Sequence, residues 1–295
     1  MKLSELGEDR LLARIFPRLK LNQAVLAGAG DDCAVLRSSR KNELILFKTD
    51  CVVEGIHFRS RENATDVGWK AMMRPLSDFA AMSGVPQFAL ITLISPSRTS
   101  VNKIDNFYRG LQKAAVRFEV SIVGGETSRT RGPMVISVSV VGFVEKNRWV
   151  SRHGGKAGDD LFVTGRLGGA TRGKHLRFIA RIEESRWLTK NFSVHAMMDL
   201  SDGLGADLPR LAKASKVGFK IDRESLPLAP GATIGNAISD GEDYELLFAI
   251  SPGESDLLQR SWRKRFSKLP LTRIGKFSKF STTSSQLSGG FVHFQ

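Results

Sequence analysis

The sequence predicts a mixed α/β fold built in two parts, with the boundary near residue 148. Strand-like and helix-like hydrophobic periodicities alternate along the chain, which is typical of mixed sheets with packed helices. A length of 295 residues is enough for two such units. A polar, glycine-rich stretch at 145–160 separates the apolar segments into two groups. We therefore expect domains at residues 1–148 and 149–295.

The first half shows strands of branched apolar residues and helices with apolar side chains at helical spacing. The strands are expected at 43–53, 121–125 and 134–144, and the helices at 64–82 and 103–118. Pro75 lies inside the first of these helices. Because proline cannot donate the helical hydrogen bond, we expect a kink or a new helix start there.

The second half repeats the same alternation after the polar stretch. Strands are expected at 161–165, 194–199, 218–222 and 244–250, and helices at 173–185 and 204–215. The strand at 194–199 runs directly into the turn "LSDG". Each half therefore combines strands with helices, as a mixed α/β fold requires.

The chain is strongly basic, with a formal net charge of +14. Its basic residues are dispersed, and the densest run, 260–268, has no recognisable nucleic-acid-binding motif around it. No stretch approaches the roughly 20 apolar residues of a membrane span, and the N-terminus has acids where a signal peptide has its apolar run. We expect a cytoplasmic protein without nucleic-acid or membrane partners.

Short acidic clusters are the unusual feature of so basic a chain. They carry Asp31, Asp32, Thr49, Asp50, Asp78, Glu126, Asp199, Ser201, Asp202, Asp240, Glu242 and Asp243. Each cluster adjoins an apolar segment, and each taken alone is equally typical of a helix cap or a turn. If the carboxylates converge in space, they repel one another. Several Mg²⁺ ions, which prefer oxygen ligands and bridge to phosphates, would relieve that repulsion.

Other common sites find no support in the sequence. In "GAGDDC" (28–33) a cysteine stands where a dinucleotide-binding loop has its third glycine. The glycine-rich run 165–174 lacks the spacing of a P-loop. Cys33 and Cys51 have neither the number nor the spacing of a disulfide framework or a zinc site.

Seven motifs occur in an order that resembles the thiamine-monophosphate kinase family, within the superfamily built like aminoimidazole ribonucleotide synthetase. They are "GAGDDCAVL", "KTDCVVEGIHF", "WKAMMRPLSDFAAMSGVPQFALITL", "VGGETSR", "VSRHGGKAGDDLFVTGRLGGA", "MDLSDGLGADLPRLAKAS" and "GEDYELLFAI". The resemblance implies the two-domain fold of that superfamily, with mixed sheets and packed helices. It also implies a homodimer, several Mg²⁺ ions, and ATP-dependent phosphorylation of thiamine phosphate to thiamine diphosphate.

The resemblance also implies roles for individual residues. The implied metal ligands are Asp32, Thr49, Asp50, Asp78, Glu126, Asp199 and Asp202. The implied ATP contacts are Tyr108, Gly125, Glu126, Arg152 and Ser201. The implied thiamine phosphate contacts are His57, Glu242 and Phe291. Of these residues, Asp78, Asp50 and Asp202 are expected to be catalytic.

Four positions depart from the family pattern. Glu126 replaces an aspartate, Pro75 replaces an asparagine, and Lys48 replaces a small hydroxyl residue. Asp240 replaces a glycine, which would strain a loop that needs positive φ. The Lys48 ammonium would either stand in for one Mg²⁺ or block it.

Other readings stay open beside the kinase. One is a divergent or inactive paralogue that acts as a nucleotide-binding regulator or uses another small phosphorylated substrate. Sister enzymes of the superfamily are a second, and a basic nucleic-acid-binding protein, which strong salt-dependent affinity for DNA or RNA would favour, is a third. Selenophosphate synthetase is disfavoured by the absence of a reactive cysteine in an N-terminal glycine-rich segment, and the hydrogenase-maturation dehydratase by the absence of a C-terminal cysteine.

Overall fold

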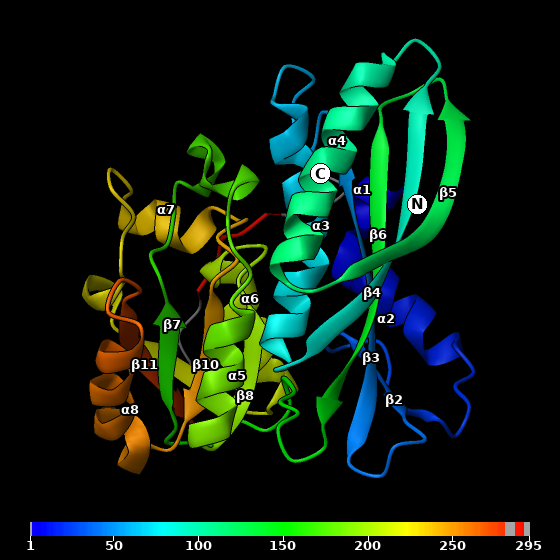
Figure 1. The fold of residues 1–295 in the computed structure, drawn as a ribbon. Helices are drawn as coiled ribbons and strands as arrows, with labels where there is room; N and C mark the ends of the chain where they lie inside the picture. Colours follow the sequence, from blue (N-terminus) through cyan, green and yellow to red (C-terminus); the bar gives the residue numbers. More distant parts are fainter. Residues whose placement is uncertain (1, 281–286, 292–295) are drawn as a thin grey trace.

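The computed structural model describes residues 2–280 and 287–291, and its strands form two sheets (Figure 1). The first sheet has the strand order β1-β2-β3-β6-β4-β5. Strands β4 and β5 run parallel, and the other neighbours run antiparallel. The strands are β1 (Val25–Ala27), β2 (Ala34–Arg37), β3 (Glu43–Val53), β4 (Val85–Pro96), β5 (Ser121–Thr130) and β6 (Val135–Glu145).

The second sheet is antiparallel throughout, with the order β8-β10-β7-β11-β9. Its strands are β7 (Asp160–Thr164), β8 (Val194–Asp199), β9 (Gly218–Ile221), β10 (Leu246–Ile250) and β11 (Leu271–Ser278). Strands β7 and β10 are buried along their whole length, because they lie inside the sheet and both faces are covered. The two sheets with their helices confirm the predicted mixed α/β fold.

The described α-helices pack against the sheets, and most of them connect strands along the chain (Figure 1). They are α1 (Leu3–Leu6), α2 (Glu8–Ile15), α3 (Ala64–Ala81), α4 (Val101–Arg117), α5 (Ile182–Asn191), α6 (Leu204–Ala214), α7 (Ile234–Ser239) and α8 (Pro252–Arg265). Short 3-10 turns are η1 (Phe16–Arg18), η2 (Ala170–Arg172), η3 (Lys174–Leu176) and η4 (Arg223–Ser225). No helix in the described ranges combines the length and the apolar character that a membrane span requires.

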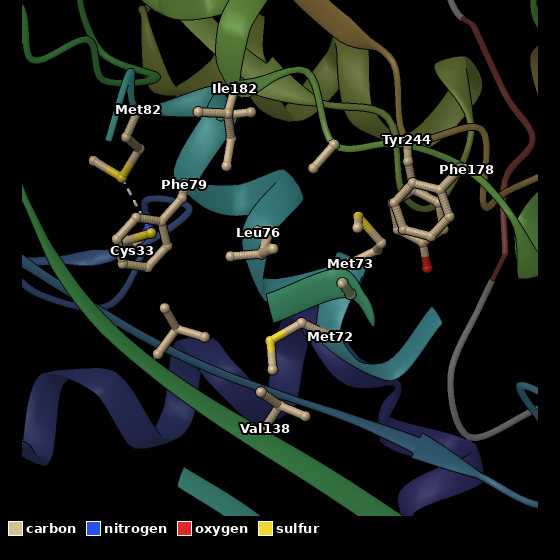
Figure 2. Packing of buried hydrophobic residues seen from close by; sticks show 14 of the residues in the cluster. Cys33, Met72, Met73, Leu76, Phe79, Met82, Val138, Phe178, Ile182 and Tyr244 are labelled. Atoms are coloured by element: carbon tan, nitrogen blue, oxygen red, sulfur yellow. Dashed lines mark hydrogen bonds between the residues drawn. The ribbon is translucent and has the colours of Figure 1, made fainter. Parts of the chain in front are cut away.

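Helix α3 lies between the two halves of the molecule. Thirteen of its 18 residues are buried, because β3, β4 and β6 lie on one side and α5 and β8 on the other. Figure 2 shows Met72 beside Val138 of β6, with Ile182 of α5 on the opposite side of the helix. The side chain of Asn63 accepts hydrogen bonds from the amides of Thr65 and Asp66 and so caps the helix start.

Two helical predictions are corrected by tertiary contacts. Helix α3 continues through Pro75, so the alternative of a new start there is wrong. The single helix predicted at 173–185 is also wrong, because only η3 and the start of α5 are helical. Between them the chain is irregular. The Phe178 ring stacks on Tyr244 at 3.9 Å (Figure 2), and Arg181 donates two 2.7 Å hydrogen bonds to Glu245.

The face of the first sheet that points away from α3 carries exposed apolar side chains, and we call it the outer face. The register aligns Phe47, Val141 and Phe88 in one row across β3, β6 and β4. Leu90 follows two residues along β4, on the same face. Phe47, Phe88 and Leu90 are 46%, 45% and 49% exposed. This sheet therefore buries one face against α3 and leaves the outer face accessible in the single chain.

Helices α3 and α4 cross at two glycines. A Cβ atom on Gly68 would lie 2.0 Å from the carbonyl oxygen of Phe107. A Cβ atom on Gly110 would lie 1.9 Å from the carbonyl oxygen of Thr65. Real Cβ atoms do not approach backbone oxygens this closely, so both positions require glycine for the helices to pack.

We predict that Gly110→Ala lowers the free energy of unfolding by about 3 kcal/mol, the upper end of the usual cost of overpacking. The added methyl group meets backbone, which cannot rotate away. Urea unfolding followed by circular dichroism measures the change. Gly235→Ala in α7 is the matched control, because the nearest atom to its Cβ is 3.6 Å away. Equal midpoints for Gly110→Ala and the wild type would refute the close crossing.

Candidate active site

Three of the carboxylates predicted to bind metal lie together between the two sheets. Asp32 precedes β2, Asp78 lies in the last turn of α3, and Asp199 is the last residue of β8. One oxygen from each lies within 4.8 Å of the others, and all three residues are buried. We call these three residues the carboxylate triad. Its donors are the oxygen ligands that Mg²⁺ prefers.

Local contacts fix each member of the triad. Gly30 adopts a φ of 116°, which turns the chain sharply before Asp32. The next amide, of Cys33, donates a 2.9 Å hydrogen bond to the Met82 sulfur just beyond α3 (Figure 2). The Ser77 hydroxyl donates a 2.6 Å hydrogen bond to Asp199 and so ties β8 to α3.

Burial makes the negative charge of the triad unfavourable. Burial, followed by the charge of Asp32, raises the pKa of Asp199 to about 6. Burial also raises the pKa of Asp78 well above its usual value, even though Lys48 acts in the opposite direction. Asp31, next to the triad, has its pKa raised to about 6 by burial and by Asp32. The triad is therefore a place where additional positive charge is stabilising.

Basic side chains already contact several of these carboxylates. Arg152 donates from Nε and Nη2 to both oxygens of Asp32, at 3.1 and 2.5 Å. The Lys48 Nζ lies 2.8 Å from Asp78 Oδ1. Burial opposes the charge of Lys48, but the attraction of Asp78 and then Asp50 outweighs it and raises the pKa of the ammonium.

Asp50 and Asp202, both predicted to be catalytic metal ligands, lie beside the triad rather than in it. Arg74 Nη2 lies 3.3 Å from Asp50 Oδ1. Asp50 is close enough to raise the pKa of Asp78 by charge repulsion. Asp202 follows Asp199 in the loop after β8 and pairs with Arg210 of α6. Both carboxylates therefore have an arginine partner.

Two predicted substrate residues meet at a lysine that sequence reasoning missed. Lys70 of α3 is fully buried, and its Nζ lies 2.5 Å from Glu242 Oε1. The same Nζ donates a 2.6 Å hydrogen bond to the carbonyl of His57. Lys70, Arg74 and Asp78 are spaced four residues apart, so they share one side of the helix. That charged stripe along a predicted buried helix is a signal that could have revealed Lys70 and Arg74.

The loop 200–203 joins the triad to the remaining predicted contacts. The carbonyl of Ser201, a predicted ATP contact, accepts the amide hydrogen of Glu242 at 2.7 Å. The carbonyl of Asp202 accepts the amide hydrogen of Phe291 at 2.8 Å. The structure thus places Glu242 and Phe291 against the same loop, which begins directly after Asp199.

Thr49 and Glu126 lie elsewhere, on the outer face of the first sheet. The Thr49 hydroxyl accepts a 2.9 Å hydrogen bond from Ser139 of β6. The register aligns Cys51, Ser137, Thr92 and Glu126 in one row, so three strand spacings separate β3 from Glu126, about 14 Å. Because successive side chains of a strand alternate between faces, Thr49 points away from the side that carries Asp50.

The predicted ATP contacts Gly125 and Tyr108 also lie apart from the triad. Gly125 is on β5 beside Glu126, where a Cβ atom would lie 1.7 Å from the carbonyl oxygen of Ile91. Tyr108 is on α4 and is 36% exposed. Helix α4 contacts β5 but packs on α3, so Tyr108 belongs to the helix-covered side of the first sheet, whereas Glu126 lies on the outer face. Of the predicted ATP side chains, Arg152 alone contacts a triad residue among the described contacts.

The expected strain at Asp240 is not present. Its φ is −73°, and its carboxylate accepts a 2.9 Å hydrogen bond from the amide of Gly169. The positive φ angles of this loop fall instead on Glu242, at 65°, and Tyr244, at 51°. Asp240 therefore holds the glycine-rich turn 165–174 against the loop and does not strain it.

Comparison with known proteins identifies relatives of this chain. Residues 30–144 match the family model for the N-terminal domain of AIR synthase related proteins, and residues 148–255 match the model for their C-terminal domain. The chain is 36% identical to the thiamine-monophosphate kinase of Rhodopirellula baltica, over 97% of both chains. It is 31% identical to the thiamine-monophosphate kinase of Haemophilus influenzae, over 98% of both chains.

Solved structures agree with these sequence relatives. The structure described as "AaThiL complexed with AMPPCP and TMP" matches with a TM-score of 0.84 and 32% identity over 99% of both chains. The hydrogenase maturation protein HypE of E. coli matches with a TM-score of 0.70 at 18% identity, over 95% of this chain and 98% of that one. The second match concerns the fold alone. The predicted superfamily fold is therefore confirmed.

We predict that, without divalent ions, Asp199→Asn is more stable than the wild type at pH 7.5, by at most about 3 kcal/mol. The folded pKa of Asp199, about 6, lies above its usual value of 3.8. Stability from this group is therefore complete below pH 3.8 and is lost as the pH rises through 6. Asparagine keeps the Ser77 contact and never ionises, so the advantage of the variant should shrink toward pH 4.

Thermal or urea unfolding between pH 4 and pH 8, in a chelator, measures this difference. Asp256→Asn is the control, because Asp256 is an exposed carboxylate on α8. An offset between Asp199→Asn and the wild type that does not vary with pH would contradict a raised pKa at Asp199.

Proposed function

Because the chain belongs to the thiamine-monophosphate kinase family of AIR synthase related proteins, we propose that it transfers the γ-phosphoryl group of ATP to thiamine phosphate. The products are ADP and thiamine diphosphate. The single observation in the fold that carries this proposal is the carboxylate triad, whose buried oxygens lie within 4.8 Å of one another. A buried group of carboxylates serves a reaction between two phosphorylated molecules when cations stand between them.

We propose that Asp32, Asp78 and Asp199 hold Mg²⁺, with Asp50 and Asp202 as neighbouring ligands. The fit rests on the chemistry of the donors: the triad offers oxygen atoms only, and its burial makes positive charge favourable. When bound, Mg²⁺ neutralises phosphate charge and keeps the transferred group in line with its acceptor.

We propose that the protein's own residues position the nucleotide. The Arg152 guanidinium is held by both oxygens of Asp32, and its side chain is 21% exposed. Its remaining donors are suited to a phosphate oxygen, since a guanidinium binds oxyanions with a planar fork. We place ATP at Arg152 and Ser201, with Tyr108, Gly125 and Glu126 as further expected contacts.

The acceptor in this reaction is itself a phosphate oxygen, which is ionised at neutral pH. No strong general base is therefore needed, and catalysis depends on positioning and on charge neutralisation. We place thiamine phosphate near Glu242, His57 and Phe291. Lys70 of α3 contacts both the Glu242 carboxylate and the carbonyl of His57 and so holds them in place. Phe291, which is 46% exposed, offers a ring face to the cationic thiazolium.

We also propose that the protein is a homodimer formed through the outer face of the first sheet. Phe47, Phe88 and Leu90 expose apolar area on this face, which is costly to leave in water. A second copy of this chain is favoured over another protein as the partner on this face, because the resemblance to the family implies that the first sheets of two protomers pair. Thr49 and Glu126 lie on the same face, so the partner chain would approach both.

The activity test uses purified protein, ATP, Mg²⁺ and thiamine phosphate, with chromatographic detection of thiamine diphosphate. We expect product to form with the wild type and to fall by about a hundredfold or more in Asp78→Asn, because a charged group that orients the reacting phosphates is lost. Circular dichroism should show an unchanged fold in that variant. Absence of thiamine diphosphate above background with the wild type would refute the kinase.

The dimer test is a mass measurement by light scattering after gel filtration. We expect the wild type to run as a dimer and the double variant Phe88→Asp, Leu90→Asp to run as a monomer, since two charges would be buried in the interface. Val101→Asp is the control, because Val101 is 75% exposed on α4, away from the outer face. A wild type that is monomeric at micromolar concentration would exclude this interface.

A further inference from the structure

The side-chain cations around the triad are distributed unevenly. Asp32 is paired with Arg152, Asp78 with Lys48 and Asp50 with Arg74. Asp199 accepts its 2.6 Å hydrogen bond from a neutral donor, Ser77. Three side-chain cations thus contact three of these four carboxylates, and Asp31, next to the triad, adds a further carboxylate, whose Oδ2 lies 3.6 Å from His153 Nδ1. The carboxylates outnumber the cations that contact them, and without Lys48 the excess of negative charge would grow by one.

Lys48 reaches the triad because side chains alternate between the two faces of β3, and Lys48 lies on the face that points toward α3. Leu44, Leu46 and Val52 are buried toward α3, and Lys48 lies on the same face because it is an even number of residues from each of them. Its Nζ lies 2.8 Å from Asp78 Oδ1, and its side chain is one quarter exposed. The ammonium therefore lies at the edge of the triad, where solvent or a bound phosphate can still approach it.

An ammonium and a Mg²⁺ ion compete for the same position. Both are compact cations that bind carboxylate oxygens directly, at 2.7–2.9 Å for the ammonium and about 2.0–2.1 Å for the metal ion. An ion on Asp78 Oδ1 would lie within a few ångströms of Nζ, where two positive charges repel strongly. The lysine is covalently attached, so its local concentration does not depend on Mg²⁺ in solution.

We propose that the Lys48 ammonium permanently occupies one cation position of the triad, so that the protein binds one divalent ion fewer than its carboxylates would otherwise hold. This inference rests on the proposed function, because it assumes that the triad binds Mg²⁺. Lys48 is therefore a positioning residue. Its ammonium holds the Asp78 carboxylate in place and supplies the positive charge that a metal ion at the same position would supply.

The first experiment counts metal ions. Mn²⁺ bound per protomer is measured by equilibrium dialysis and electron paramagnetic resonance, with a non-hydrolysable ATP analogue present. We expect Lys48→Met to bind one Mn²⁺ more than the wild type, and Lys48→Arg, which keeps the charge, to match the wild type. Lys113→Met, on the exposed side of α4, is the matched control and should not change the count.

A second measurement uses the wild-type chain and does not depend on the folding of Lys48→Met. The protein is labelled with ¹³C at the lysine Cε carbons, and the Lys48 signal is identified by its loss in Lys48→Arg. We expect this signal to keep its position when Mg²⁺ and the ATP analogue are added. Movement of the signal to the position of exposed lysines would mean that the metal displaces Lys48, and would overturn the proposal.

The outcomes separate this inference from the proposed function. Equal Mn²⁺ counts for Lys48→Met and the wild type overturn the role of Lys48 and leave the kinase untouched. A wild type that binds no Mn²⁺ and forms no thiamine diphosphate overturns the proposed function, and this inference with it.

Discussion

The burial of the Asp78 carboxylate between two sheets is the constraint on which the rest of the site depends. A charged carboxylate loses its hydration there, and burial raises its pKa well above the usual value. The fold tolerates this because Lys48 of the first sheet contacts Asp78 directly. Two further carboxylates from separate segments, Asp32 and Asp199, add to the same charge. A fold arranged for stability alone would not place three such groups together.

Helix α3 shows how packing and chemistry share one element. Its apolar residues, such as Met72 and Leu76, fill the core next to the first sheet. Its charged stripe of Lys70, Arg74 and Asp78 faces the predicted ligands, and each of the three is paired with a residue from another segment. The glycine crossing with α4 fixes the position of the helix. A shift of α3 would therefore disturb the core, the triad and the Glu242 contact together.

The sequence predicted seven of the eleven described strands and the helices α3, α4 and α6, because their signals are local. The strand at 43–53 and the helix beginning at Ala64 follow from the periodicity of their apolar residues. The helix predicted at 173–185 failed because Phe178 and Arg181 are held by Tyr244 and Glu245, more than 60 residues away in the chain. Such long-range contacts leave no periodic pattern in the segment itself.

Prediction of the site had a similar limit. Each triad residue was named from its motif, but their convergence is a property of the tertiary fold. The alternation of side chains along a strand could have predicted that Thr49 and Asp50 point to opposite faces of the sheet. The sequence analysis also did not predict which basic side chains pair with the triad carboxylates, and this was the larger omission. Arg152 and Lys48 offset the charges of Asp32 and Asp78, while the hydrogen bond that Asp199 accepts, within the described part of the chain, comes from a neutral hydroxyl. Negative charge without a paired cation therefore remains at the end of β8, beside the loop that carries Ser201 and contacts Glu242. A divalent ion bound at Asp199 would supply positive charge that no side chain among the described residues provides at that point.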